Sequence, residues 1–258
     1  LQGLSLHLKP GDFATIIGSN GAGKSTFLKT AAGLIPPVKG TLTLGQQVLM
    51  GYFDQQTAAL QSDLTVVEHF HEQFPSLTDK EVRQTLGAFL FTGKDTAKKV
   101  SSLSGGEKSR LVLAELFKSC PNFFVLDEPT NHMDIPAKET LESAFRAYTG
   151  TLLFVSHDRY FIRQVAESLL IFDDQSVFYY PFGYEHYLAH RNQGSGEELA
   201  ASLRAEEQAL LSGLQSVPMP ERHRLREYST EQSYEDWQLR LLTEPMEPVS
   251  YTHLRAHE

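Results

Sequence analysis

The first candidate site is a glycine-rich run that begins at Gly18. Residues 18–25 read GSNGAGKS and fit the G-x-x-x-x-G-K-[ST] pattern. Backbone N–H groups in such a run can wrap around phosphate oxygens, because glycine has no Cβ to obstruct the approach. Lys24 would then reach the β- and γ-phosphates of a nucleotide, and the Ser25 hydroxyl would bind Mg²⁺. The expected phosphate-binding residues are Gly18, Ser19, Asn20, Gly21, Ala22, Gly23, Lys24, Ser25 and Thr26.

Two acidic residues, Asp127 and Glu128, follow the apolar run 123–126. Strand alternation would send their side chains to different sides, so that one holds a metal ion while the other faces a water molecule. This division suits phosphoryl transfer, in which Mg²⁺ neutralises phosphate charge and a base orients the nucleophile. We therefore expect Asp127 in the Mg²⁺ shell and Glu128 as the general base.

Two further polar residues follow strand-like runs. His157 comes directly after the apolar run 151–156, and Gln55 follows 51–54. Ligand sites in open α/β sheets gather at the carboxyl ends of strands, so His157 would lie near Gly18 and Asp127 and orient Glu128. The neutral amide of Gln55 would bind Mg²⁺ or its water. A single histidine or glutamine is usually structural, so these two assignments depend on the order of motifs given below.

Strands alternating with helices must position these residues. Apolar runs predict strands over 11–17, 122–126, 151–156 and 168–173, and helices are expected over 24–33, 105–118 and 137–148. This alternation predicts an α/β domain with a largely parallel sheet. The helix from residue 24 would point the positive end of its dipole at the anion bound by the glycine-rich run.

Composition excludes several classes of protein. The 258 residues suit one large domain, or one domain with an appendage. The net charge of -9 argues against binding nucleic acid through overall charge, and no DNA partner is expected. The single cysteine, Cys120, excludes an intrachain disulfide framework and fits a reducing, cytoplasmic location. No apolar run of about 18 residues is present, so we expect no membrane span.

The run Leu103-Ser104-Gly105-Gly106-Glu107 resembles the signature motif of ATP-binding cassette (ABC) ATPases. The order of glycine-rich loop, glutamine, signature, Asp-Glu strand end and histidine matches that superfamily over roughly residues 1–175. The resemblance implies a P-loop NTPase fold of the ABC type and Mg-dependent ATP hydrolysis. It adds Ser104, Gly105, Gly106 and Glu107 to the ATP-binding residues. In this superfamily the P-loop of one cassette faces the signature of another, with ATP between them.

A subfamily resemblance rests on residues 127–135 (DEPTNHMDI) and 154–161 (FVSHDRYF), which are similar to the ABC-F pattern. Proteins of that subfamily carry two cassettes and act on ribosomes as translation factors or antibiotic-resistance proteins. The aromatic run 180–187 resembles the segment that follows such cassettes, and residues 81–93 are more similar to a second cassette than to a first. The resemblance implies that a second cassette and the ribosome are partners.

On this interpretation residues 1–190 form the ATP-binding domain, with a helical arm over 57–104. Composition shifts after about residue 191, and a Gly-Ser-Gly run at 194–196 is typical of a linker. We expect a helical C-terminal extension over 191–248 and an unstructured tail over 249–258, which we interpret as not native. The chain begins at Leu1 rather than at methionine, which we interpret as a piece of a longer protein.

Two alternative functions stay open. The ATP-binding subunit of a membrane transporter would share every catalytic motif, and its arm would dock onto membrane-domain helices. A non-enzymatic interaction module would have a degenerate cassette, which the intact Lys24, Asp127, Glu128 and His157 disfavour.

Overall fold

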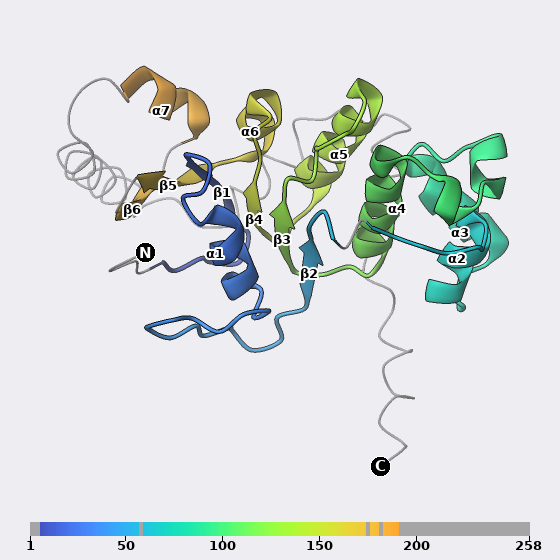
Figure 1. Ribbon diagram of the computed structural model, residues 1–258, viewed down its shortest axis with the longest axis horizontal. Helices are drawn as coiled ribbons and strands as arrows, with labels where there is room; N and C mark the ends of the chain where they lie inside the picture. The colour runs from blue at the N-terminus through green and yellow to red at the C-terminus, as the bar shows by residue number, and fades with distance from the viewer. Residues whose placement is uncertain (1–5, 57–58, 174–175, 181–182, 191–258) are drawn as a thin grey trace, which may run out of the picture.

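The computed structural model describes residues 6–56, 59–173, 176–180 and 183–190. Its strands are β1 (Phe13–Gly18), β2 (Met50–Phe53), β3 (Phe123–Asp127), β4 (Thr151–Val155), β5 (Ser168–Asp173) and β6 (Ser176–Tyr180). They form one sheet in the order β2-β3-β4-β1-β5-β6 (Figure 1). The first five strands run parallel, and β6 pairs with β5 in the antiparallel direction. The predicted α/β class with a largely parallel sheet is confirmed.

The register of the sheet determines where the site lies. Asp127 at the end of β3 is level with Val155 at the end of β4. On the other side of β4, Ile16 of β1 is also level with Val155, two residues before Gly18. The carboxyl ends of β1, β3 and β4 therefore meet at one edge, and each of the three predicted chemical motifs follows one of these strands.

Helices cover the sheet on both faces and extend beyond one end of it. They are α1 (Lys24–Ala31), α2 (Val66–Gln73), α3 (Asp79–Ala88), α4 (Gly105–Lys118), α5 (Ile135–Ala147), α6 (Arg159–Val165) and α7 (Tyr184–His190), with the 3₁₀ turns η1 (Gly93–Ala97) and η2 (Val100–Ser102). Leu28 of α1 packs on one face with Ile16 and Leu153. Aromatic rings fill the other face, where Phe117 of α4 lies 4.9 Å from Phe124, measured between ring centroids.

Two helices, α2 and α3, lie within the predicted arm segment 57–104, at the end of the molecule away from β6 (Figure 1). Each begins with a threonine capping box, in which a threonine and a glutamate three residues later satisfy each other's N–H groups. Their apolar faces share one core with α4, through Phe70, Leu86 and Leu111. The arm and the start of α4 are thus packed together.

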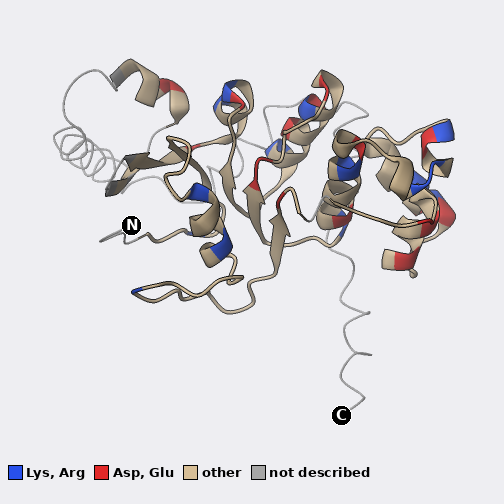
Figure 2. Ribbon diagram, in the orientation of Figure 1, with Lys and Arg blue, Asp and Glu red and all other residues tan. Residues whose placement is uncertain are grey.

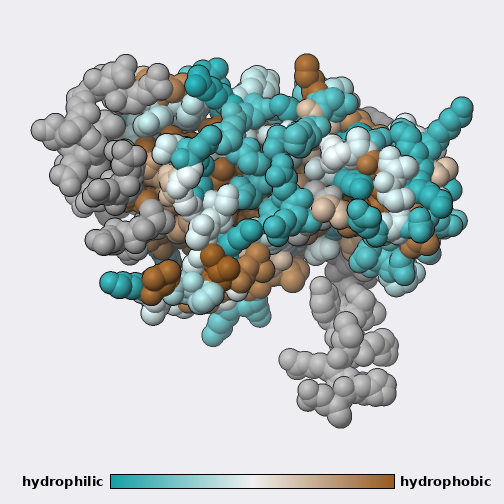
Figure 3. Space-filling view, viewed as in Figure 1, coloured by the Kyte–Doolittle hydropathy of each residue, from teal (hydrophilic) through white to brown (hydrophobic). Residues whose placement is uncertain are grey.

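Apolar side chains are exposed along residues 34–49, which form neither helix nor strand. They appear as a brown band along the lower edge of the molecule (Figure 3). The residues are Leu34, Leu42, Leu44, Val48, Leu49 and the fully exposed Val38.

Some expected features differ or lie outside the described residues. β6, α6 and α7 were not expected from the sequence. The extension over 191–248 and the tail over 249–258 fall outside the described part, so the domain division stays a prediction. In the part that the structure describes, no helix combines the length and apolar character that crossing a bilayer requires.

Candidate functional site

An open cavity of about 380 Å³ lies at the carboxyl edge of the sheet. Residues from the glycine-rich loop, α1 and the ends of β3 and β4 meet there, between Asn20 and His157 of the sequence. In Figure 2 the ribbon is coloured blue for basic residues on α1 and red for acidic residues at the end of β3. The lining residues are Asn20, Gly21, Gly23, Lys24, Ser25, Thr26, Asp127, Glu128, Val155 and His157.

The loop before α1 requires glycine at two positions for different reasons. A Cβ on Gly18 would lie 2.5 Å from the carbonyl oxygen of Phe172, because β5 passes directly beside it. Gly23 has φ +90° and caps α1 without a side-chain hydrogen bond. The first N–H groups of α1 therefore face the cavity side without a side-chain cap, as in a helix start that binds an anion.

Lys24 is the buried cation of this site. Its Nζ donates to the carbonyl oxygens of Gly18, at 2.9 Å, and Ser19, at 2.8 Å. Only 8% of the residue is exposed. The ammonium is thus held against the loop that an entering phosphate group would meet, and little side-chain entropy remains to be lost when the anion binds.

The expectation that Asp127 and Glu128 point to different sides is wrong, since both line the same cavity. The strand ends at Asp127, and Glu128 has φ +54°, in the left-handed region. Its N–H still donates to the carbonyl oxygen of Val155, while its carbonyl accepts from the N–H of Asn131. This turn ends the alternation one residue before Glu128 and brings both carboxyls to one site.

Burial raises the pKa of Glu128, although a hydrogen bond from the His157 backbone opposes the shift. Its Oε2 accepts from the His157 N–H at 3.1 Å. Its Oε1 is buried, makes no hydrogen bond within the described residues, and lies 3.4 Å from His157 Nε2. The carboxyl is fixed at one oxygen and unsatisfied at the other, an arrangement suited to accepting a proton from a water molecule.

The residues present fit a magnesium ion that also binds phosphate. Asp127 supplies a carboxylate and Ser25 a hydroxyl, both hard oxygen ligands, in one cavity. Among the described residues no group of three or more His, Cys, Asp or Glu side chains could form an all-protein metal site. Mg²⁺ typically keeps several waters and binds one or two protein oxygens plus substrate phosphates, so this sparse set agrees with its chemistry.

Several predicted site residues do not line the cavity. Gly18, Ser19 and Ala22 belong to the loop but are not among the lining residues. Gln55 is exposed after β2 and is likewise absent from the lining. The signature residues 104–107 begin α4 and are also outside it.

Polar contacts around the site were missed by sequence reasoning. Asp54, next to Gln55, is buried, accepts from the Tyr52 hydroxyl at 3.0 Å and lies 3.6 Å from Lys29 Nζ of α1. Lys138 of α5 donates to Asp158 at 2.7 Å, immediately after His157. The pairs Lys29 with Asp54 and Lys138 with Asp158 each join different elements, and no local pattern could have revealed them.

The fold and the cavity define a P-loop ATPase domain of the ABC class. The sequence profile described as "ABC transporter" matches residues 1–131, and this chain belongs to that family. The relatives that it matches include members of the F subfamily. "Putative ATP-binding protein YdiF" of Bacillus subtilis is 46% identical over 75% of this chain and 30% of its own length. "ABC transporter F family member 5" of Arabidopsis thaliana is 41% identical over 80% of this chain and 30% of its own length.

Another relative, "ATP-binding cassette sub-family F member 3" of Mus musculus, is 39% identical over 67% of this chain and 25% of its own length. The chain therefore spans about a third or less of the length of these curated relatives. The resemblance to ABC-F cassettes is confirmed.

Solved structures show the same fold. "RNase-L Inhibitor" matches with TM-score 0.58 and 25% identity, over 69% of this chain and 36% of that chain. The dimeric post-hydrolysis state of the ATP-binding cassette MJ0796, bound to ADP and Pi, matches with TM-score 0.55 and 23% identity. The match covers 67% of this chain and 85% of that chain. The expected ABC-type nucleotide-binding fold is confirmed.

Proposed function

We propose that this chain binds Mg-ATP at the carboxyl edge of its sheet and hydrolyses it with Glu128 as general base. The observation that carries the proposal is the position of Glu128. It is a partly buried carboxyl with a raised pKa, in the same cavity as Lys24 and Asp127. A base that activates water must lie in the site that holds the reacting phosphate, and its pKa should lie near the working pH.

The residues divide the work as follows. Lys24 and the N–H groups at the start of α1 bind the phosphate oxygens. Asp127 and Ser25 hold Mg²⁺, which supplies positive charge to those oxygens when bound. The water oxygen attacks the γ-phosphorus, the bond to the bridging oxygen of ADP breaks, and the water proton passes to Glu128. His157 keeps Glu128 oriented through its N–H and ring, and donates to the γ-phosphate.

A second cassette completes the site in this proposal. The signature residues begin α4 and do not line the cavity of their own chain, so the cavity has Lys24 on one side and no signature opposite it. The related MJ0796 cassette was solved as a dimer bound to ADP and Pi, which supports the same arrangement here. Gln55, exposed after β2, would join the Mg²⁺ shell only as the two cassettes close.

The decisive experiment uses the Glu128→Gln variant with and without Mg-ATP. We expect hydrolysis to fall by about 10²–10⁴-fold, the usual contribution of a general base, while nucleotide binding persists. The variant should form a dimer with ATP but not with ADP, measured by analytical ultracentrifugation. Glu139→Gln, the same change at an exposed carboxyl of α5, is the matched control and should behave as the parent. Turnover by Glu128→Gln at the parent rate would overturn the assignment.

We further propose that the whole protein is an ATP-driven switch on the ribosome, in the cytoplasm, as a translation factor or an antibiotic-resistance protein. The F-subfamily relatives support this role, and the family description as transporter supports the alternative of a membrane-associated subunit. The full-length Glu128→Gln protein should co-sediment with ribosomes in ATP and release in ADP. Sedimentation with membrane vesicles instead would favour the transporter subunit.

A further inference from the structure

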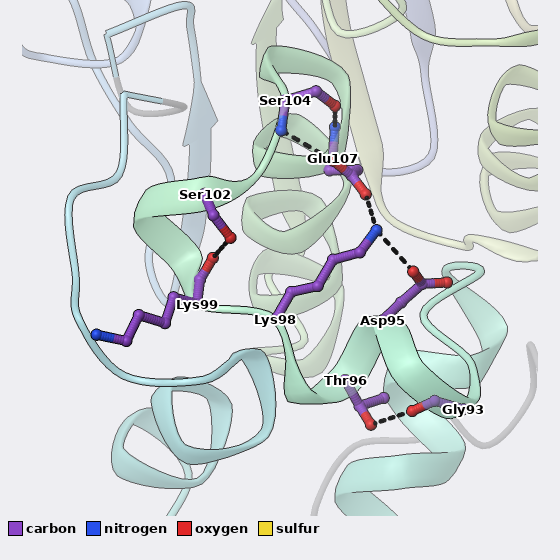
Figure 4. A network of polar contacts seen from close by, with 8 residues as sticks. All are labelled: Gly93, Asp95, Thr96, Lys98, Lys99, Ser102, Ser104 and Glu107. Carbon is purple, nitrogen blue, oxygen red and sulfur yellow. Dashed lines mark hydrogen bonds and ion pairs between the residues drawn. The ribbon is translucent and has the colours of Figure 1, made fainter.

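A three-membered charge network connects the last part of the arm to the first turn of α4. Lys98 follows η1, and its Nζ lies 2.7 Å from Asp95 Oδ1 and 2.9 Å from Glu107 Oε1 (Figure 4). Lys99, the next residue, points away from this network in the same view. Its Nζ lies 3.8 Å from Asp63, and both of these side chains are largely exposed, at 62% and 93%. Two adjacent lysines thus have very different surroundings.

Glu107 connects Lys98 to the start of α4. Its Oε2 accepts from the Ser104 N–H at 2.8 Å, while Ser104 Oγ accepts from the Glu107 N–H at 3.3 Å. This capping box fixes the first turn of the helix. Burial alone would raise the pKa of Glu107, but hydrogen bonds from the Ser104 N–H and Lys98 outweigh it and lower the pKa to about 2. The carboxylate is therefore charged at neutral pH.

A charged carboxylate is unfavourable beside a helix start that must accept a phosphate. It offsets the positive end of the helix dipole and repels the incoming anion. Lys98 compensates for this charge: the set of Asp95, Lys98 and Glu107 carries one net negative charge, and would carry two without Lys98. The lysine therefore preserves the anion-binding character of the signature.

The backbone of Lys98 is itself fixed to α2 of the arm. Its carbonyl oxygen accepts from the N–H of Val66, the first residue of α2, at 3.0 Å. The next residue, Lys99, forms a bridge with Thr65. A side chain anchored in this way can transmit the position of the arm to the first turn of α4.

We infer that Lys98 is a positioning residue for the signature: it holds the Glu107 carboxylate and offsets its charge, so that Ser104 and the N–H groups of Gly105 and Gly106 can bind the triphosphate held by a second cassette. This inference rests on the two-cassette arrangement proposed above. An ordinary exposed ion pair would contribute little to stability, and its loss would leave activity unchanged. A change in activity on loss of Lys98 therefore distinguishes a positioning role from a merely structural one.

The test compares Lys98→Met with Lys99→Met, which removes the neighbouring charge but no contact to Glu107. In the Glu128→Gln background, the ATP concentration for half-maximal dimer should rise about tenfold for Lys98→Met and stay unchanged for Lys99→Met. With Glu128 intact, the ATP turnover of Lys98→Met should fall about tenfold, and that of Lys99→Met should stay at the parent rate. Binding of N-methylanthraniloyl-ATP to the monomer should not change, because Lys98 and Glu107 do not line the cavity formed by the glycine-rich loop and the start of α1. Lys98→Arg should restore most of the loss.

A second pair of variants tests the route through Glu107. In the Glu107→Gln background, Lys98→Met should have little additional effect on dimer formation, since the charge it offsets is gone. Equal behaviour of Lys98→Met and Lys99→Met would overturn the inference, as would equally weakened nucleotide binding by the monomer. If the Glu128→Gln parent itself forms no dimer with ATP, the two-cassette proposal fails first, and this inference with it.

Discussion

The two glycines of the signature have opposite surroundings, which gives a sharp prediction. A Cβ at Gly106 would lie 2.3 Å from the carbonyl oxygen of His132, while a Cβ at Gly105 would meet nothing within 4 Å. His132 already has φ +60°, so its backbone is restrained in a conformation that residues other than glycine rarely adopt. Gly106 thus packs closely against the backbone of His132, whereas the space around Gly105 would accept a side chain.

The magnitude follows from this geometry. In Gly106→Ala, either the His132 backbone or the start of α4 must move by about 1 Å to restore an ordinary contact distance. Overpacking of this kind costs about 1–3 kcal/mol, and the better helix propensity of alanine returns at most about 1 kcal/mol. For a domain of this size each kcal/mol shifts the melting temperature by about 2–4 °C. We expect Gly106→Ala to melt several degrees below the parent, and Gly105→Ala at or slightly above it.

The assay is thermal unfolding followed by circular dichroism, without nucleotide and at equal protein concentrations. The same two variants are then compared for ATP-driven dimer formation in the Glu128→Gln background. Gly105→Ala should lose dimer formation despite its intact fold, because its new methyl group faces the open side that would meet the nucleotide. Equal melting temperatures for the two variants, or a lower one for Gly105→Ala, would refute the reasoning.

Two further predictions concern ion pairs between helices. The hydrogen bond to Glu115 raises the pKa of His69 above its ordinary value, so the pair stabilises the fold fully below about pH 6.5 and loses this contribution as pH rises through the folded-state pKa. Urea unfolding between pH 6 and 9 should therefore show a smaller loss of stability for His69→Gln than for the parent, while His7→Gln, at an exposed position, should match the parent. Lys138→Met should lower the free energy of unfolding by about 1 kcal/mol or less, because the pair with Asp158 is partly exposed, and should have no effect in an Asp158→Asn background.

Local patterns in the sequence were sufficient for the loop and the parallel strands. The spacing of Gly18, Lys24 and Ser25 is contained in one turn between a strand and a helix, and buried strands such as β4 read directly as apolar runs. The parallel sheet then follows, because strands alternate with helices. The position of the cavity follows in turn from the shared carboxyl edge.

Nonlocal contacts explain what the sequence could not predict. The direction of Glu128 depends on its positive φ and on His157, 29 residues away. The contact of Lys98 with Glu107 spans nine residues and the 3₁₀ turn η2, whose geometry no periodicity specifies. The edge strand β6 pairs with β5 in the antiparallel direction, which the alternation of strands and helices does not anticipate.

The energetics of the proposed switch explain why its signature needs support from the arm. ATP can close two cassettes only through its higher affinity for the closed state, and a shift from 1:99 to 99:1 requires about 5.5 kcal/mol of that difference. A tenfold weakening of ATP-driven dimer formation on loss of Lys98 corresponds to about 1.4 kcal/mol, a quarter of this difference. The closed population would then fall from about 99% to about 90% at saturating ATP, and far further where ATP is limiting. The effect of Lys98 should therefore be largest near the half-maximal ATP concentration, where the arm that carries it can modulate closure.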